Sequence, residues 1–499
     1  MASKTTLNAK NLEALGAARL AELLISLSQG NAAAKRSLRL ALAAEAGPAD
    51  VAREVRKRLA TIARSGSFLD WRQCDALLKD LEQQRQAIIG PIASADPALA
   101  VDLLWSLLEL VEPLVERCAD SDGVLMPLFH QATADLGLVA ERAQGKPEAL
   151  ADQVYGALLD NGYGQFDHLI EHLHPALGLA GLEQLRLRLN GLRGRKSGCE
   201  SALITVRLAM LEIADALGDA EAYLAEYRDH DPEGLKVPVF AAEVAERLTA
   251  AGRAAEALAI LEAADPEICG RQAGSTAWLD ARIAALEALQ RQEEAQALRW
   301  RQVERSLSIQ YLRDYLKCLP AFEDGEAEDR ALDLAFTGAD FEQALHFLHL
   351  WPDQRRAARL ILERHEELDG DSYELLSPVA EALERQQPLA ATLCLRAMID
   401  FSLDQARFSR YKHAARHLAT CRSLAARIDD WAGHGDHASY RLRLGLDHVL
   451  KHGFWGSVGE DPLSFPAAGH EPAVAPLRVS ATASSQAGGG ELNQGQLTF

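Results

Sequence analysis

The segment HLIEH, which begins at His168, has residue types and a spacing that could bind zinc. His168, Glu171 and His172 match HxxEH, a zinc-protease signature in which two imidazoles hold the metal and the glutamate lies near a bound water. On one helix, residues four apart face the same way, so both imidazoles would reach one ion. A third protein ligand is also required; His174 follows, but Pro175 comes next and is expected to end the helix. A metal-dependent hydrolase is therefore one alternative, and a solvated helix end is the simpler interpretation.

A second group of histidines could also bind a metal. Six histidines fall within about 40 residues, and the first two and the last two are spaced i,i+4, which suits Zn²⁺ or Ni²⁺. They are His413, His417, His434, His437, His448 and His452. Few other ligands lie beside these pairs, so solvated or half-buried helix residues are the default interpretation. No nucleotide-binding glycine motif and no GxSxG elbow occurs in the sequence, so we predict neither a cofactor nor an enzyme.

Two basic stretches could contact a phosphate backbone or an acidic partner. AREVRKRLATIAR places Arg53, Arg56, Lys57 and Arg64 in one broad helical sector. RLRLNGLRGRKSG, predicted to be a loop, contains Arg186, Arg188, Arg193, Arg195 and Lys196. Aromatic residues are not interleaved with these cations, as single-stranded nucleic-acid binding would favour. We therefore expect solvated surfaces and no direct contact with nucleic acid.

The segment ELNQGQLTF carries a third candidate motif. Gln494, Leu497 and Phe499 fit Q-x-x-L-x-F and resemble the short motifs by which bacterial proteins dock on the replication sliding clamp. In those motifs the glutamine forms a hydrogen bond and the Leu/Phe pair fills an apolar pocket. The usual leucine at the second position is Gly495 here. This motif supports a replication or repair accessory as an alternative function. The simpler interpretation is a tail that binds no particular target.

Composition limits the class of protein that carries these motifs. The chain has 499 residues, 48% of them hydrophobic, and a net charge of −20, which argues against broad coating of nucleic acid. Residues 1–66 are the exception, with 11 Lys/Arg against 5 Asp/Glu. Seven scattered cysteines without CxxC spacing suit reduced thiols. The start has no apolar signal region, and the most apolar window, ALAVDLLWSLLELVEPLV, carries three carboxylates. We expect a cytoplasmic protein with no membrane span and read that window as one buried helix.

Helical periodicity dominates the chain. Asp96 and Pro97 form a typical N-cap and first helical residue, and Pro147 opens another helix that is expected to stop at Asn161–Gly162. Alanine and leucine are abundant, and no sustained run of alternating β-branched residues occurs. The sequence therefore predicts an all-α fold.

One helix–turn–helix pattern recurs. GRAAEALAIL around Ala257 is followed by similar stretches around Ala295, Ala344 and Ala391, at spacings of 38, 49 and 47 residues. A single hairpin cannot bury its apolar face, so neighbouring hairpins are expected to stack. We predict a degenerate tetratricopeptide-like α-solenoid; a non-repeating helical bundle is the alternative.

We predict three regions along the chain. Residues 1–155 form an N-terminal helical region, 156–457 a tetratricopeptide-like repeat region, and 458–499 a mostly disordered tail rich in Pro, Ala, Ser and Gly.

The sequence also resembles a known family. DNGYGQFDHLIEHLHPALGLAGLEQLR (160–186) and the histidine-rich stretch from SRYKHAARHLATCRSLAARIDDW to DHVLKHGFW (409–455) look like domain-of-unknown-function family 6880, an uncharacterised bacterial group. The N-terminal ALGAARLAELLISLS and EVRKRLATIARSGSFLDW are similar to it as well, so the resemblance covers about 8–456. The C-terminal part also resembles the helical region that follows zinc-binding SWIM modules, but their CxC…CxH ligands are absent. The resemblance implies an all-helical, repeat-like protein and supplies no activity.

These observations together favour a binding protein over an enzyme. Stacked hairpins expose a long concave surface, which here would be acidic on average. We expect a non-catalytic scaffold or adaptor that holds another protein there as a helix, a peptide or a basic segment.

Overall fold

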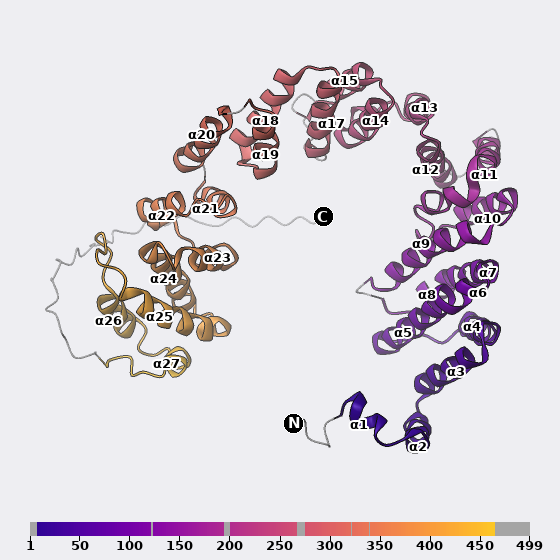
Figure 1. Cartoon of the computed structure of the whole chain (residues 1–499), viewed down its shortest axis with the longest axis horizontal. Helices are drawn as coiled ribbons and strands as arrows, with labels where there is room; N and C mark the ends of the chain where they lie inside the picture. Colours follow the sequence, from indigo (N-terminus) through magenta and orange to yellow (C-terminus); the bar gives the residue numbers. More distant parts are fainter. Residues whose placement is uncertain are drawn as a thin grey trace, which may run out of the picture. The chain divides into compact units, whose positions relative to one another are not determined.

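The chain is described by a computed structural model that covers residues 7–464 except 121–122, 194–199, 267–274, 321 and 339. The described residues form helices joined by turns, as Figure 1 shows, and β structure among them is limited to one isolated bridge between Leu69 and Cys118. The structure confirms the predicted all-α class.

The chain divides into two compact units, Met1–Leu298 and Arg299–Phe499, called unit 1 and unit 2 below. The boundary that the sequence places at residue 155 falls inside α10. The helices of unit 1 are α1 (Ala9–Glu13), α2 (Ala17–Ser28), α3 (Ala32–Ala46), α4 (Pro48–Ala63), α5 (Trp71–Ala87), the π-helical turn η1 (Ile88–Ile92), α6 (Ala93–Ala95), α7 (Pro97–Leu108), α8 (Val111–Val115), α9 (Leu125–Ala143), α10 (Pro147–Leu159), α11 (Leu169–Arg193), α12 (Glu200–Leu217), α13 (Ala220–His230), η2 (Gly234–Lys236), α14 (Pro238–Ala250), α15 (Ala254–Ala263) and α17 (Ser275–Ala288).

Helix α18 (Gln292–Ser306) includes the division between the units. The helices that follow in unit 2 are α19 (Ile309–Lys317), α20 (Glu323–Gly338), α21 (Phe341–Leu350), α22 (Gln354–Glu363), η3 (His365–Glu367), α23 (Tyr373–Leu383), α24 (Pro388–Asp404), η4 (Phe408–Arg410), α25 (Tyr411–Ala425), α26 (His437–Asp447) and α27 (His452–Val458).

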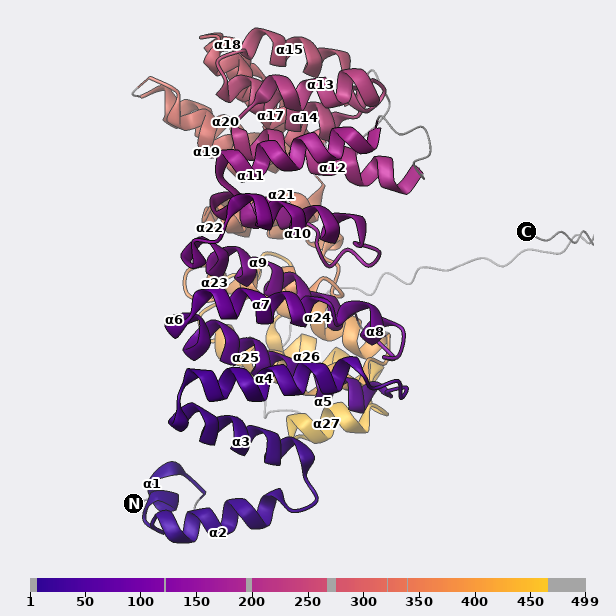
Figure 2. The same cartoon turned by 90° about the vertical axis from the view of Figure 1, so that its right-hand side faces the viewer.

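Helices that are close in the sequence pack against each other within each unit. In unit 1, α3 packs on α4, α4 on α7, α7 on α9, and α9 on α11; Figure 2 shows α3, α4, α7 and α9 as successive layers. In unit 2, α23 packs on α24, α24 on α25, and α25 on α27. Each unit therefore builds its core mainly from neighbours along the chain.

The predicted helix starts are confirmed, and one predicted helix is corrected. The Asp96 carboxylate accepts a hydrogen bond from the Leu99 backbone N–H at 3.0 Å, and Pro97 and Pro147 are the first residues of α7 and α10. The apolar window read as one helix instead forms two, α7 and α8, with Glu109 and Leu110 between them. No helix among the described residues is long and apolar enough to cross a membrane.

The four alanines singled out by the repeated pattern occupy equivalent positions. Each is the fourth residue of the second helix of a consecutive pair, and each side chain is fully buried. They are Ala257 in α15, Ala295 in α18, Ala344 in α21 and Ala391 in α24. A small side chain at this position lets a neighbouring helix approach closely, as the sequence predicts.

The turn before two of these helices is also the same. Gly252 and Gln290 have positive φ values of 77° and 61°, and the next residue donates its backbone N–H to a carbonyl five residues earlier. These bonds join Arg253 to Leu248 at 2.7 Å and Arg291 to Leu286 at 2.9 Å. This is the Schellman pattern of helix termination, in which a left-handed residue satisfies the last carbonyls of the helix.

Candidate functional site

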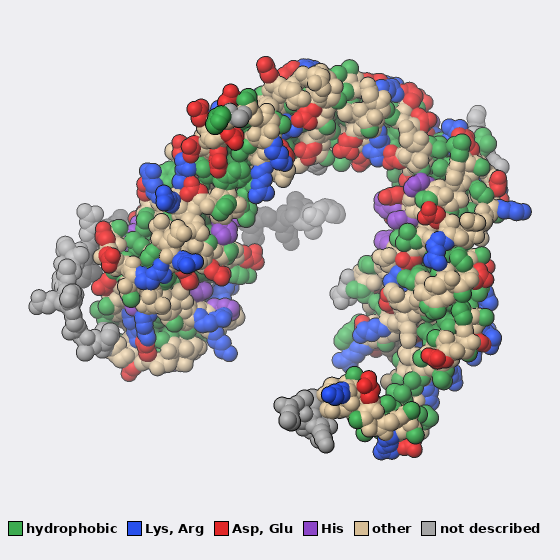
Figure 3. Space-filling view, viewed as in Figure 1, with side chains coloured by type: hydrophobic (Ala, Val, Ile, Leu, Met, Phe, Trp, Pro, Cys, Tyr) green, Lys and Arg blue, Asp and Glu red, His purple; other side chains and the backbone are tan. Residues whose placement is uncertain are grey.

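The structure places the HxxEH residues differently from the zinc-site prediction. His168 lies before α11, which starts at Leu169, and has a positive φ of 62°. The helical i,i+4 geometry therefore does not apply to His168 and His172. The Nδ1 atom of His168 instead lies 3.1 Å from a carboxylate oxygen of Glu171, and both side chains are well exposed. Figure 3 shows histidine side chains on the surface of unit 1 beside α9.

Helix α11 also continues past the proline that was expected to end it. It is interrupted at Gly178, whose φ of 53° and ψ of −172° are not helical. Pro175 has no N–H to offer the carbonyl of Glu171. The Nδ1 atom of His174 lies 2.7 Å from that carbonyl oxygen and takes the place of the missing donor. The HxxEH histidines therefore sit at the N-terminal end of a helix, not at the C-terminal end that the sequence suggested.

The C-terminal histidines do not form a common site. His448 is the C-cap of α26 and His452 is the first residue of α27, so the predicted i,i+4 pair is divided between two helices. The Nε2 atom of His448 lies 3.4 Å from a carboxylate oxygen of Asp404. His413 and His417 do share α25, and burial lowers the pKa of His417. Within the described residues, no three His, Cys, Asp or Glu side chains gather as a metal site would require.

The first basic stretch is exposed along α4. Arg53, Arg56, Lys57 and Arg64 all lie on its solvent side, or at its C-cap, opposite the buried face. Arg53 forms an ion pair of 2.7 Å with Asp50. Arg58 of the same stretch pairs with the buried Asp80 at 2.7 Å. The four predicted cations thus form a solvated helix face on which Arg53 is paired.

The second basic stretch is a correction, because its first three arginines lie in α11 and not in a loop. Arg186 pairs with Glu183 at 2.7 Å, and Arg188 pairs with Asp152 at 3.2 Å. Arg193 pairs with Glu226. Arg195, Lys196 and the tail motif of Gln494, Leu497 and Phe499 lie outside the described residues.

The tail predicted from residue 458 begins with residues that contact α25 and α26. The buried guanidinium of Arg441 donates to the carbonyl oxygen of Pro462 at 2.9 Å and to that of Asp461 at 2.8 Å. The Glu460 carboxylate accepts hydrogen bonds from Arg422 and Arg441. Hydrogen bonds from Arg422 of α25 and Arg441 of α26 therefore hold the segment that follows α27 against these two helices.

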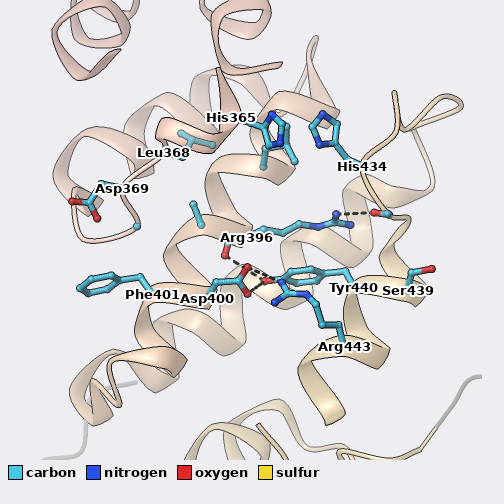
Figure 4. Close-up of a pocket in the computed structure, with 14 residues that line it drawn as sticks. His365, Leu368, Asp369, Arg396, Asp400, Phe401, His434, Ser439, Tyr440 and Arg443 are labelled. Atoms are coloured by element: carbon cyan, nitrogen blue, oxygen red, sulfur yellow. Dashed lines mark hydrogen bonds and ion pairs between the residues drawn. The ribbon is translucent and has the colours of Figure 1, made fainter. Parts of the chain in front are cut away.

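The candidate site is a pocket in unit 2 that no sequence motif indicated. It has a volume of about 650 Å³ and is formed by three elements: the segment from His365 to Gly370, helix α24, and the start of α26 with the connection before it. Figure 4 shows side chains from these elements pointing toward one another. The pocket combines apolar side chains, including Leu368, Leu393 and Phe401, with charged and imidazole groups.

A close backbone approach forms one wall of the pocket. A Cβ atom built at Gly370 would lie 2.1 Å from the carbonyl oxygen of Ala397, so only glycine lets this segment pack on α24. Asp400 joins α24 to α26, because its carboxylate accepts hydrogen bonds from Tyr440 at 2.9 Å and from Arg443 at 2.7 Å. Burial and Asp400 raise the pKa of Tyr440, so this hydroxyl remains a donor.

Arg396 lies at the centre of the site. Its guanidinium lies over the rings of Trp431 and Tyr440, at 4.9 and 4.4 Å from their centroids, and donates to the Gly435 carbonyl oxygen at 2.7 Å. The residue is 7% exposed. Burial lowers the pKa of Arg396.

Two imidazoles stand beside this guanidinium. His365 and His434 meet edge to face with their ring centroids 4.5 Å apart, and Figure 4 shows the pair next to Arg396. Burial, His365 and Arg396 lower the pKa of His434. The site is therefore an arginine beside aromatic and imidazole rings at the wall of an open pocket.

Sequence patterns indicated these residues only in part. His434 was noticed among the C-terminal histidines. Arg396 and Asp400 were not, although their i,i+4 spacing on a helix would predict an ion pair. Asp400 instead binds two residues of α26, and only the fold brings these elements together.

A model of the family of unknown function DUF6880 matches residues 2–457. The chain belongs to this family. The match covers nearly all of unit 1 and unit 2 up to residue 457, and it confirms the resemblance seen in the sequence. No match was found among curated proteins or among solved structures.

Proposed function

We propose that the protein is a non-catalytic scaffold or adaptor that binds another protein, and that the pocket of unit 2 receives part of this partner. The observation that carries the proposal is the pocket itself, which is open, measures about 650 Å³ and is formed by three separate elements. Concave sites of this size, with apolar walls and a few placed polar groups, are typical of specific recognition.

The arrangement of helices supports a binding role. Four alanines at the same position of four helices, all fully buried, favour a tetratricopeptide-like series of hairpins. Stacked hairpins of this kind recognise partners along extended surfaces and need no chemistry to do so. We include in the proposal that the helix pairs form a solenoid and that the protein acts in the cytoplasm, where its free cysteines would stay reduced.

The polar groups in and near the pocket favour binding over catalysis. Asp400 is engaged by Tyr440 and Arg443, and His448 lies beside Asp404. A general base must be within reach of a substrate proton in a usable protonation state. These side chains are instead occupied with one another, which suits a rigid recognition surface.

The proposal is tested by capturing partners on the immobilised full-length chain. Ser439 is exposed at the rim of the pocket on α26, so Ser439→Trp would fill the entrance. Its neighbour Ala438 is also exposed but does not line the pocket, and Ala438→Trp is the matched control. A protein captured by the wild type is then purified, and its affinity for the three chains is measured by calorimetry.

We expect Ser439→Trp to weaken this affinity at least about tenfold and Ala438→Trp to leave it unchanged. Capture of no protein by the wild type, or equal affinity of the purified partner for the Ser439→Trp chain, would contradict the proposal.

A further inference from the structure

Arg396 is a buried cation with too few acceptors. One guanidinium nitrogen donates to the Gly435 carbonyl, but Nε and the other terminal nitrogen are buried and have no hydrogen-bond partner. Arg441, which is buried to a similar extent, bonds with two carbonyls and a carboxylate. Among the described arginines, Arg396 is the one that leaves two buried nitrogens without an acceptor. Buried charges are normally paired, so this arrangement indicates a missing anionic partner.

The acidic residues that line the pocket do not supply that partner. Asp400 accepts its hydrogen bonds from Tyr440 and Arg443. The Asp369 carboxylate accepts from the Asp371 backbone N–H at 2.8 Å. Neither carboxylate has a hydrogen bond with Arg396 among the described contacts.

Two imidazoles lie near this guanidinium. Burial is the main cause that lowers the pKa of His434 and of His437, the second to about 4, and Arg396 contributes to both shifts. Both ring nitrogens of His437 lack a hydrogen-bond partner. The side of the pocket around Arg396 therefore presents a guanidinium and imidazoles, whereas the carboxylates of Asp369 and Asp400 bind other groups.

We propose that this pocket binds an oxyanion, a carboxylate or phosphate group on an apolar body, whose oxygens accept hydrogen bonds from Arg396. A guanidinium fork matches both kinds of oxyanion in geometry and charge. The apolar body would lie against Leu368, Leu393 and Phe401. The inference deepens the proposed function by naming the chemical group of the partner that enters the pocket.

Access to Arg396 requires one side chain to move. His434 lies in the mostly exposed connection between α25 and α26, and Figure 4 shows it beside the guanidinium. The His434 backbone N–H donates to the Trp431 carbonyl oxygen at 2.8 Å, but its imidazole has only the edge-to-face ring contact and no hydrogen bond among those described, so the ring can rotate while the backbone stays in place. Its displacement would uncover the two nitrogens that lack acceptors.

The test is titration of the full-length chain with hexanoate and with phenyl phosphate, followed by calorimetry or by chemical shifts. Hexanamide, which has no charge, is the matched ligand control. The variants are Arg396→Gln, which removes the cation, and Ser439→Trp, which fills the pocket and leaves Arg396 in place. Ala438→Trp is the control chain, and circular dichroism verifies that each variant is folded.

We expect saturable binding of at least one oxyanion and none of hexanamide. Both Arg396→Gln and Ser439→Trp should weaken binding at least about tenfold, as loss of a charge-assisted hydrogen bond does, and Ala438→Trp should not. The two ligands distinguish a carboxylate site from a phosphate site.

The inference is overturned if neither oxyanion binds saturably, or if folded Ser439→Trp binds as the wild type does. These outcomes are separate from failure of the proposed function. Capture of a protein that depends on the pocket, without oxyanion binding, would reject the oxyanion and keep the scaffold. Oxyanion binding without any protein partner would keep the anion site and reject the scaffold.

Discussion

At the scale of single residues, the most buried ion pair within the described part of the chain joins Arg85 of α5 to Asp135 of α9, with side chains 8% and 9% exposed. Arg85 also pairs with Glu82 at 2.8 Å, so removing the Asp135 charge takes away one of its two carboxylate partners. We expect Asp135→Asn to lower the free energy of unfolding by about 1.5–3 kcal/mol, the contribution of a hydrogen bond to a charged group. Asp75→Asn, which removes an exposed pair with Lys79, should change it by less than about 1 kcal/mol. Urea denaturation of both variants measures the difference, and equal effects would contradict the assignment.

The buried cysteines give a second prediction. Burial and the neighbouring Cys118 raise the pKa of Cys74 to about 12, and burial raises the pKa of Cys394 to about 12 as well. The thiolate is the reactive form, so these thiols should resist alkylation at pH 8. Exposed Cys318 should react. Mass spectrometry after timed iodoacetamide treatment locates the label; fast labelling of Cys74 in the folded chain would show that its environment is wrong.

His437 gives a pH dependence. Burial and two arginines, Arg396 and Arg422, lower its pKa from 6.5 to about 4. Asp436 and Glu460 act in the opposite direction on the same imidazole but do not offset this. Between these values the unfolded chain binds a proton that the folded chain does not, so this group makes stability fall as pH decreases from about 6.5 to about 4.

We expect the His437→Gln variant to lose about 1–3 kcal/mol less stability than the wild type when the pH is lowered. The measurement is urea denaturation of the wild type and the variant at pH 7 and at pH 4.5. If both chains lose the same stability over this interval, the imidazole is not held neutral in the fold.

The residue scale also shows what the sequence could not predict. Arg396 and Asp400 have the spacing of an ion pair on α24, yet Asp400 is bound by Tyr440 and Arg443 from another helix. Local spacing cannot reveal such competition between partners that are about 40 residues apart. The lack of hydrogen-bond acceptors around Arg396, the central residue of the site, can be recognised only in the folded structure.

At the scale of elements, local rules predicted more. The N-cap of α7, the first proline of α10 and the buried alanines of four helices follow from the sequence because each depends on residues within one or two turns. The prediction that His168 and His172 share one helix was wrong because it depended on the exact start of that helix. Helix α11 begins at Leu169, one residue after His168. The identity of an element is thus easier to predict than its boundary.

Ala391 tests the close approach of helices. It is fully buried at the fourth position of α24, so Ala391→Leu must push neighbouring side chains apart. We expect a loss of about 1–3 kcal/mol, as overpacked cores typically show. Ala438→Leu, at an exposed position of α26, should have little effect. Hydrogen exchange of α24 reports unit 2 separately from unit 1, and unchanged protection in Ala391→Leu would argue against tight packing at this position.

At the scale of the whole molecule, the net charge of −20 and the guanidinium of Arg396 act over different distances. The overall charge repels free anions at long range, and salt screens this repulsion beyond about 10 Å. The hydrogen bonds offered by Arg396 act only at contact. A basic segment of a partner protein that carries one acidic side chain would be attracted by the overall charge and could place its carboxylate against Arg396. Such a partner agrees with both the basic segment expected from the sequence and the oxyanion inferred from the pocket.

The most direct test of the central claim is competition on the full-length chain. The partner captured by the wild type is bound to the immobilised protein and then washed with increasing hexanoate or phenyl phosphate, with hexanamide as control. Recognition through the Arg396 pocket predicts that at least one oxyanion releases the partner and that hexanamide does not. Retention of the partner by the wild type at saturating concentrations of both oxyanions would contradict the account.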